Sequence, residues 1–314
     1  MSTVSRGVFL LSMMLALPGW GGVAAVSNEG SASITLIDTA TDEVLAQVAT
    51  GGKPRGIAAH PAQRVIYLSD QKNNALLVVD LESRAVRRSI ALGESPEGVY
   101  VSPDGRLVAA AIEASNSVVF VDTVGEAVAF KVEVAGRNPE HGVFSPDGKW
   151  LYVGAEDGDT VEAIDVAKRS VVASIKVGER PRGIAFLPDS SKAYVACEIA
   201  GTVEVIDVAR RKAVTSIPMG IRPAGVLVDP SGARLYVSIG GDSRVSVVDT
   251  STDTVTARIE VGKRPWNMAI TKDGRKLYVA NGRSNTVSII DTERNARVRD
   301  VPVGELPWGV AVSN

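Results

Sequence analysis

One phrase recurs seven times along this chain of 314 residues, at intervals of 42 or 43 residues. It consists of a Gly, two variable residues, a Pro, one variable residue and, as a rule, a second Gly. Its prolines are Pro54, Pro96, Pro139, Pro181, Pro223, Pro265 and Pro307. A column of aspartates has the same period and comprises Asp38, Asp80, Asp122, Asp165, Asp207, Asp249 and Asp291. Two columns that agree on seven units predict a repeat architecture.

Each unit has the pattern of short β-strands. Apolar residues alternate with a period of two, as in Tyr194-Val195-Ala196, which is strand patterning. Turns such as Pro103-Asp104-Gly105 join a first strand to a second, because Pro fixes φ and Gly supplies a positive φ. Four short antiparallel strands match one propeller blade, whose apolar faces are covered by its neighbours. The sequence therefore predicts an all-β fold, a seven-bladed β-propeller with four-stranded blades.

The two ends of the chain predict how the ring closes. Ala25 to Asn28 occupies the place of Tyr278 to Asn281, so the propeller begins at the second strand of a blade. The C-terminal segment that starts at Pro307 has the pattern of a first strand and nothing more. We therefore expect the last blade to combine the C-terminal strand, innermost, with three N-terminal strands. Such closure removes the exposed edges of an open array.

The N-terminus predicts export. Arg6 precedes an apolar run from Val8 to Leu17, and small residues end in Val23-Ala24-Ala25. This pattern is typical of a cleavable signal peptide over residues 1–25, followed by the propeller over residues 26–314. The run is too short to span a bilayer, so we expect no membrane anchor after cleavage and a periplasmic location.

Composition excludes several classes of function. Lys and Arg total 34 against 36 for Asp and Glu, which gives a formal charge of -2. Nucleic acid is therefore not an expected partner, because no basic surplus is available for a phosphate backbone. Cys197 is the single cysteine, so a cysteine-based zinc site cannot be built.

The phrases Tyr152-Val153, Tyr194-Val195, Tyr236-Val237 and Tyr278-Val279-Ala280-Asn281 resemble the YVTN-type β-propeller repeat family. With its leader and seven units, the chain is most similar to the exported propellers associated with pyrroloquinoline-quinone-dependent alcohol catabolism. The resemblance implies a periplasmic protein that works beside quinoprotein dehydrogenases, and it makes pyrroloquinoline quinone (PQQ) a candidate cofactor. The chain departs from the repeat pattern at Ala109, in the tyrosine column, and at His141, where Gly recurs.

The residue after each repeat proline is predicted to surround one mouth of the central channel. Around the ring these residues are Arg55, Glu97, Glu140, Arg182, Ala224, Trp266 and Trp308. Trp offers a stacking surface and Arg a bidentate grip on a carboxylate, so the ring suits a small amphipathic ligand. The alternative is that the tryptophans merely cap the channel and the charges pair in water. The predicted ligand or partner site also includes the neighbouring His141 and Asn267.

A second ring comes from the loops after the second strands and reads Glu29, Gln71, Glu113, Glu156, Glu198, Gly240 and Gly282. Its glutamates could hold a hard cation such as calcium. Nearby basic residues, Lys53, Arg180, Arg222 and Arg264, favour a solvated collar of ion pairs instead, and we predict no metal site.

These features favour a binding or scaffold protein, with a periplasmic protein or a small amphipathic molecule as its partner. Two alternatives remain open. One is an enzyme of the lactonase or lyase kind, with His141 and Glu140 as an acid–base pair. The other is docking of a redox cofactor such as PQQ between Trp266 and Trp308, with Arg55 binding a carboxylate. No catalytic residue is assigned, and the aspartate column is interpreted as structural, because Asp can accept hydrogen bonds from the N–H groups of its own turn.

Overall fold

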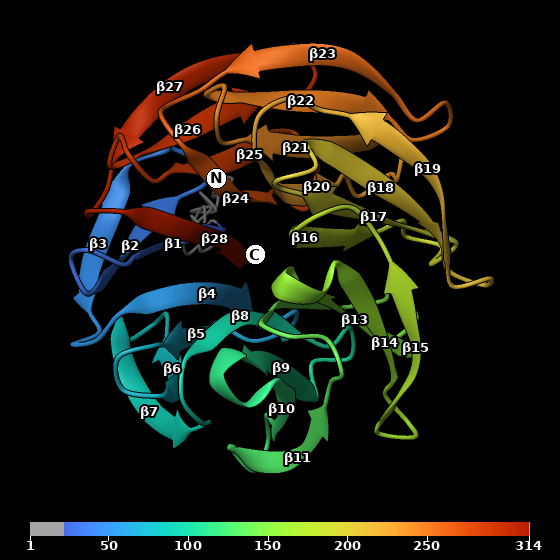
Figure 1. Cartoon of the computed structure of the whole chain (residues 1–314). Coiled ribbons are helices and arrows are strands. Elements are labelled where there is room, and N and C mark those ends of the chain that lie inside the picture. Colours follow the sequence, from blue (N-terminus) through green and yellow to red (C-terminus); the bar gives the residue numbers. More distant parts are fainter. Residues whose placement is uncertain (1–21, 314) are drawn as a thin grey trace, which may run out of the picture.

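The computed structural model describes residues 22–313, which form seven four-stranded antiparallel sheets arranged as the blades of a ring (Figure 1). The predicted seven-bladed propeller is confirmed. Six blades are built from consecutive strands, and the innermost strand of each starts at a repeat proline. Two short 3-10 helices, η1 (Glu113–Ser115) and η2 (Glu156–Gly158), lie in loops after second strands.

The first three of these blades contain β4 (Pro54–Ala59), β5 (Val65–Asp70), β6 (Ala75–Asp80) and β7 (Ala85–Ala91); β8 (Pro96–Val101), β9 (Leu107–Ile112), β10 (Ser117–Asp122) and β11 (Ala127–Glu133); and β12 (Pro139–Phe144), β13 (Trp150–Ala155), β14 (Thr160–Asp165) and β15 (Ser170–Lys176). The next three contain β16 (Pro181–Phe186), β17 (Lys192–Cys197), β18 (Thr202–Asp207) and β19 (Lys212–Pro218); β20 (Pro223–Val228), β21 (Arg234–Ile239), β22 (Arg244–Asp249) and β23 (Thr254–Glu260); and β24 (Pro265–Ile270), β25 (Lys276–Asn281), β26 (Thr286–Asp291) and β27 (Ala296–Pro302).

The seventh blade joins the two ends of the described chain. Its strand order is β28 (Pro307–Ser313), β1 (Val23–Asn28), β2 (Ser33–Asp38) and β3 (Val44–Ala49). β28 pairs antiparallel with β1 from Val23↔Ser313 to Asn28↔Pro307, and the C-terminus lies near the centre of the ring (Figure 1). The predicted closure by one C-terminal and three N-terminal strands is confirmed.

The predicted leader falls mostly on residues 1–21, which lie outside the described residues, so it stays a prediction. Its last three residues, Val23 to Ala25, are described and form the first half of β1. Ala24 and Ala25 are completely buried. Removal of a leader before Val23 would leave β1 whole, whereas cleavage after Ala25 would remove half of the strand.

The core consists of the interfaces between blades. A tyrosine in the second strand of five blades is almost completely buried: Tyr67, Tyr152, Tyr194, Tyr236 and Tyr278. Neighbouring innermost strands approach so closely that a Cβ at Gly98 would lie 2.5 Å from the carbonyl oxygen of Glu140. The second Gly of the repeat is therefore needed for close approach of two backbones.

The aspartate column is structural, as predicted. Asp38 accepts hydrogen bonds from the backbone N–H groups of Ala40 and Thr41 at 2.7 and 3.0 Å. The other six aspartates accept comparable bonds from their own turns. None of the helices within residues 22–313 is long and apolar enough to cross a membrane.

Candidate functional site

The loops that carry the two predicted rings lie on one face, as expected from strand direction. In every blade the backbone N–H of the second-ring residue donates to the carbonyl of the residue before the repeat proline. Glu198 N–H to Arg180 O, at 2.9 Å, is one example. This repeated bond brings the glutamates of the second ring next to the side chains of the first ring. We call this side of the molecule the proline face.

The first ring fills the channel mouth instead of only surrounding it. Arg55 Nη1 lies 2.6 Å from Glu97 Oε1, and Arg182 Nη1 forms an ion pair with Glu140. The Arg182 guanidinium also lies 5.7 Å from the centre of the Trp266 ring. Glu97, Glu140 and Arg182 are buried. The predicted residues therefore converge, but most of them are packed against one another.

Arg182 is the centre of one cluster of charges. Its guanidinium forms ion pairs with Glu140, Glu156 and Glu198, and its Nε lies 2.8 Å from Glu198 Oε2. Glu198 also pairs with Arg264 Nη2 at 2.9 Å. The predicted ion pairs thus exist, but the collar is only partly solvated: Glu156 and Glu198 are buried, whereas the side chains of Lys53 and Arg222 are 44% and 58% exposed. Burial makes each pair dependent on its partner, since an unpaired buried charge is costly.

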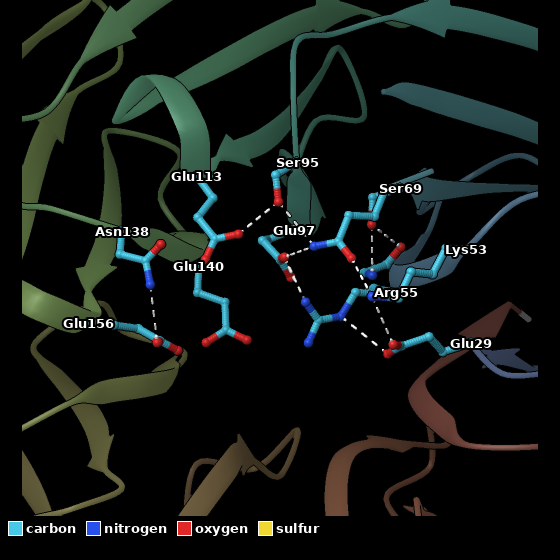
Figure 2. A network of polar contacts seen from close by, with 12 residues as sticks. Glu29, Lys53, Arg55, Ser69, Ser95, Glu97, Glu113, Asn138, Glu140 and Glu156 are labelled. Carbon is cyan, nitrogen blue, oxygen red and sulfur yellow. Dashed lines mark hydrogen bonds and ion pairs between the residues drawn. The ribbon is translucent and has the colours of Figure 1, made fainter. Parts of the chain in front are cut away.

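Arg55 is the centre of a second cluster, between Glu97 and Glu29 (Figure 2). Its Nε lies 3.4 Å from Glu29 Oε2, and Lys53 Nζ lies 3.1 Å from the other oxygen of Glu29. Glu113, the remaining glutamate of the second ring, accepts a 2.7 Å hydrogen bond from the Ser95 hydroxyl. Glu29 and Glu113 thus have partners of their own, whereas Glu156 and Glu198 share Arg182, so each of the four glutamates already has a basic or hydroxyl partner. Within residues 22–313 no group of His, Cys, Asp or Glu is arranged to hold a metal ion.

Burial perturbs three carboxyl groups at this mouth. The pKa of Glu97 is raised to about 8, mainly because burial disfavours its charged form. Burial and a hydrogen bond to Glu140 raise the pKa of Glu156 to about 9. Burial alone would raise the pKa of Glu140 as well, but the charge of Arg182, together with the Glu156 carboxyl and the charge of Arg55, more than offsets this and lowers it. At neutral pH the Glu140–Glu156 pair therefore holds one proton.

These raised pKa values predict that the folded protein loses stability as the pH rises. Folded Glu97 keeps its proton up to about pH 8, whereas an unfolded Glu loses it near pH 4.3. The folded state then binds more protons, so the free energy of unfolding falls between these limits, by at most about 1.4 kcal/mol per pH unit and group. Urea unfolding from pH 5 to pH 9 measures this decline. The Glu97→Gln variant should decline less steeply, and an equal slope would contradict the assignment.

His141 and Trp308 close the channel behind the charges. Their rings stack at 5.4 Å between centroids with 14° between planes, and both side chains are buried. The pKa of His141 is lowered to about 4, chiefly by burial and against the opposing charge of Glu140. His141 and Asn267 occupy the place of the second repeat Gly in their units. Two departures from the repeat thus meet across the channel.

The geometry gives the acid–base hypothesis no support. His141 Nδ1 lies 4.0 Å from Glu140 Oε2, which is too long for a hydrogen bond. Both side chains are buried, so a substrate would have to displace their neighbours to reach them. The lowered pKa also leaves His141 uncharged at neutral pH.

A cavity of about 270 Å³ remains on the proline face, between β24 and β28. We call it the mouth pocket. It is lined by Glu29, Arg55, Arg264, Trp266, Gly282, Arg283, Leu306, Pro307 and Trp308. Three guanidinium groups and one carboxylate give it a net positive charge. It contains three residues of the predicted site, Arg55, Trp266 and Trp308.

The indole faces in this pocket are already partly covered. The guanidinium of Arg264 lies 4.3 Å from the centre of the Trp266 ring, and that of Arg55 lies 5.3 Å from the centre of the Trp308 ring. Such contacts are favourable cation–π interactions. The tryptophans therefore orient the arginines. The sequence suggested that the indole rings are available for stacking on a ligand, but in the structure arginine side chains partly cover them.

Two residues of the mouth pocket were missed by the sequence analysis, Arg283 and Leu306. Arg283 is exposed and its side chain forms no ion pair with any described residue. It directly follows Gly282 of the second ring, so its place in the repeat was the available signal. Leu306 is 50% exposed at the rim and immediately precedes a repeat proline.

Comparisons with known proteins agree with this architecture. A family model described as YNCE-like beta-propeller matches residues 38–234, more than half of the chain. Kuenenia stuttgartiensis hydrazine synthase is similar in structure, with a TM-score of 0.80 and 23% identity over 91% of this chain and 99% of that chain. A functionally unknown protein from Desulfotomaculum acetoxidans DSM 771 has a TM-score of 0.82 and 16% identity over 93% of this chain and 99% of that chain. At these identities the likeness shows the fold alone. No curated protein matches the sequence.

Proposed function

The chain belongs to the YNCE-like beta-propeller family, and we propose that it is an exported binding protein whose mouth pocket takes a small organic acid. A propeller fold hosts many functions, so the proposal rests on the site. The observation that carries it is the group of three arginines, Arg55, Arg264 and Arg283, beside two tryptophans in one cavity.

The arginines differ in how much of their charge is already used. Arg55 and Arg264 are paired with buried glutamates, whereas Arg283 has no such partner among the described residues. A ligand carboxylate can therefore bind Arg283 in the bidentate manner that guanidinium favours without breaking an internal pair. The guanidinium groups of Arg55 and Arg264, which the glutamates keep in position, add to the positive electrostatic potential in the pocket. An anion is favoured over a neutral molecule in this pocket.

The rim of the pocket favours an acid with an apolar body. Leu306 is half exposed, and Pro307 and the edges of two indoles lie beside it. An apolar cavity of about 150 Å³ accepts one benzene ring, so about 270 Å³ suits an acid with one or two rings. The small amphipathic ligand expected from the sequence is thus specified as an aromatic or alicyclic carboxylate.

PQQ is a narrower proposal for the same pocket. Its planar rings carry three carboxylates, which match the arginines in charge. Its fused rings exceed the space for one or two rings, so it would project from the pocket. A role beside quinoprotein-dependent alcohol oxidation rests on the resemblance of the repeats to the exported YVTN-type group. We therefore include PQQ as a competitor in the binding experiment.

The proposed location is the periplasm, on the strength of the leader pattern in residues 1–25. A protein partner on the proline face is the alternative to a small acid. The concave pocket favours the small molecule, because small-molecule sites are typically concave and largely preformed.

The binding experiment uses 2-naphthoate as the probe. We expect the Arg283→Gln variant to bind 2-naphthoate about tenfold more weakly than the wild type, because it loses a charged hydrogen bond. Isothermal titration calorimetry measures the affinity, and PQQ is added as a competitor. Arg294→Gln is the matched control, because Arg294 is exposed and lies in a turn of the opposite face after β26.

If Arg283→Gln and Arg294→Gln bind 2-naphthoate with equal affinity, the mouth pocket is not the binding site of this acid. If neither 2-naphthoate nor PQQ binds the wild type, a small acid is not the ligand, and a protein partner on the proline face becomes the proposed function. Hydrolysis of a lactone by the wild type, lost in His141→Ala, would instead support the enzyme hypothesis.

A further inference from the structure

We propose that the central channel holds a second binding site, which opens on the face opposite the proline face and takes a neutral, mainly apolar molecule. A cavity of about 300 Å³ lies between the innermost strands of the blades. Its lining comes from all seven innermost strands and includes Tyr100, Phe144, Phe186, Val226, Asn267 and Trp308. Pro146, from the turn after β12, also lines it, which places its opening at the turn face.

The channel cavity and the mouth pocket are separated by a wall of side chains. Trp308 lines both cavities, and it is stacked on His141. Asn267 lines the channel cavity and not the mouth pocket. A molecule in the channel cavity therefore lies behind the wall, and it does not need the arginines of the proposed organic-acid site.

The lining of the channel cavity determines the class of ligand. Among the described residues that line it, none has a charged side chain. The buried charges of Arg182 and Glu140 have their own partners on the other side of the wall. A charged ligand would lose its hydration here without gaining a counter-charge, which is costly. The cavity thus discriminates against the acids that the mouth pocket takes.

Asn267 supplies a polar contact within this apolar lining. The other blades, except that of His141, have Gly at this repeat position, so Asn267 adds an amide where the repeat would place none. An amide donates and accepts hydrogen bonds, which suits a single hydroxyl or carbonyl group of a ligand. The volume is about twice that of a cavity that accepts benzene. A neutral alcohol or ketone of about two rings therefore fits in both size and polarity.

The experiment compares three probes of similar shape, 2-naphthol, naphthalene and 2-naphthoate, by titration of the full chain. Val226→Trp is designed to fill the channel cavity, and Val124→Trp is its control, because Val124 is 86% exposed. We expect 2-naphthol to bind the wild type and Val124→Trp saturably and to lose at least tenfold in affinity for Val226→Trp. Binding of 2-naphthoate, which uses the mouth pocket, should be unchanged by Val226→Trp, and this also verifies that the variant is folded.

A second variant tests the polar contact without filling the cavity. Asn267→Leu has nearly the same shape but no amide, so it should weaken 2-naphthol binding about threefold to tenfold and leave naphthalene binding unchanged. Saturable 2-naphthol binding that is equal in the wild type and Val226→Trp would overturn the proposal. So would the absence of saturable binding of both neutral probes to the wild type. Either result would leave the proposed organic-acid site untouched, because that site is measured with 2-naphthoate and Arg283→Gln.

Discussion

Deletion of β28, residues Pro307–Ser313, is expected to abolish the cooperative thermal transition of the protein. β28 is the innermost strand of the closing blade and pairs with β1 along its whole length. It also contacts the innermost strands of both neighbouring blades, β4 and β24. Its loss exposes the edge of β1 and the buried Trp308 and Val310 positions, so three blades lose packing at once. Total stabilities are typically about 5–15 kcal/mol, and an opened ring is not expected to retain most of that.

Circular dichroism during heating measures this effect. A synthetic peptide that spans residues 307–313 serves as the control, because its addition should restore part of the transition by supplying the missing strand. A truncated protein that melts at the same temperature as the full chain would contradict closure by β28.

The second large effect is expected from Arg182→Met. The substitution keeps much of the side-chain volume but leaves the buried carboxyl groups of Glu140, Glu156 and Glu198 without their shared cation. Removal of one partner from a buried ion pair typically costs about 3–5 kcal/mol. We expect a loss of this size in the free energy of unfolding at pH 8, measured by urea denaturation.

The pH dependence of this loss identifies its cause. Arg182 holds the pKa values of Glu140 and Glu198 below their ordinary range, so removal of Arg182 raises both in the folded state. Raised carboxyl pKa values favour folding at low pH and lose that advantage as pH increases. The difference between variant and wild type should therefore be smaller at pH 5 than at pH 8. Arg210→Met is the control, because the Arg210 side chain is 77% exposed in its pair with Asp207; it should change stability by less than about 1 kcal/mol. A pH-independent difference would argue for lost packing as the cause.

The fold was predictable because the spacing of the repeat defines the number of blades and the position of the strands in each blade. Seven prolines and seven aspartates mark the same strand positions in every unit, and the missing strands at the two ends complement each other. The direction of the strands then places Arg55, Arg182 and Trp308 on one face without any knowledge of side-chain contacts.

The burial of the charges was not predictable from the pattern. It depends on how narrow the channel is, and this follows from the close approach of the innermost strands at residues such as Gly98. Pairs such as Arg264 with Glu198, and the stack of His141 on Trp308, join side chains of non-adjacent blades. The repeat defines neighbours around the ring, but contacts across the channel depend on its width and on individual rotamers. The separation of the space into a mouth pocket and a channel cavity has the same origin.

The most direct test of the central claim is a crystal structure of the protein in complex with 2-naphthoate. We predict that the acid lies in the mouth pocket, with its carboxylate on the guanidinium of Arg283 and its rings against Leu306 and Trp266. A structure in which 2-naphthoate binds elsewhere, with the mouth pocket filled by solvent alone, would contradict the proposed function.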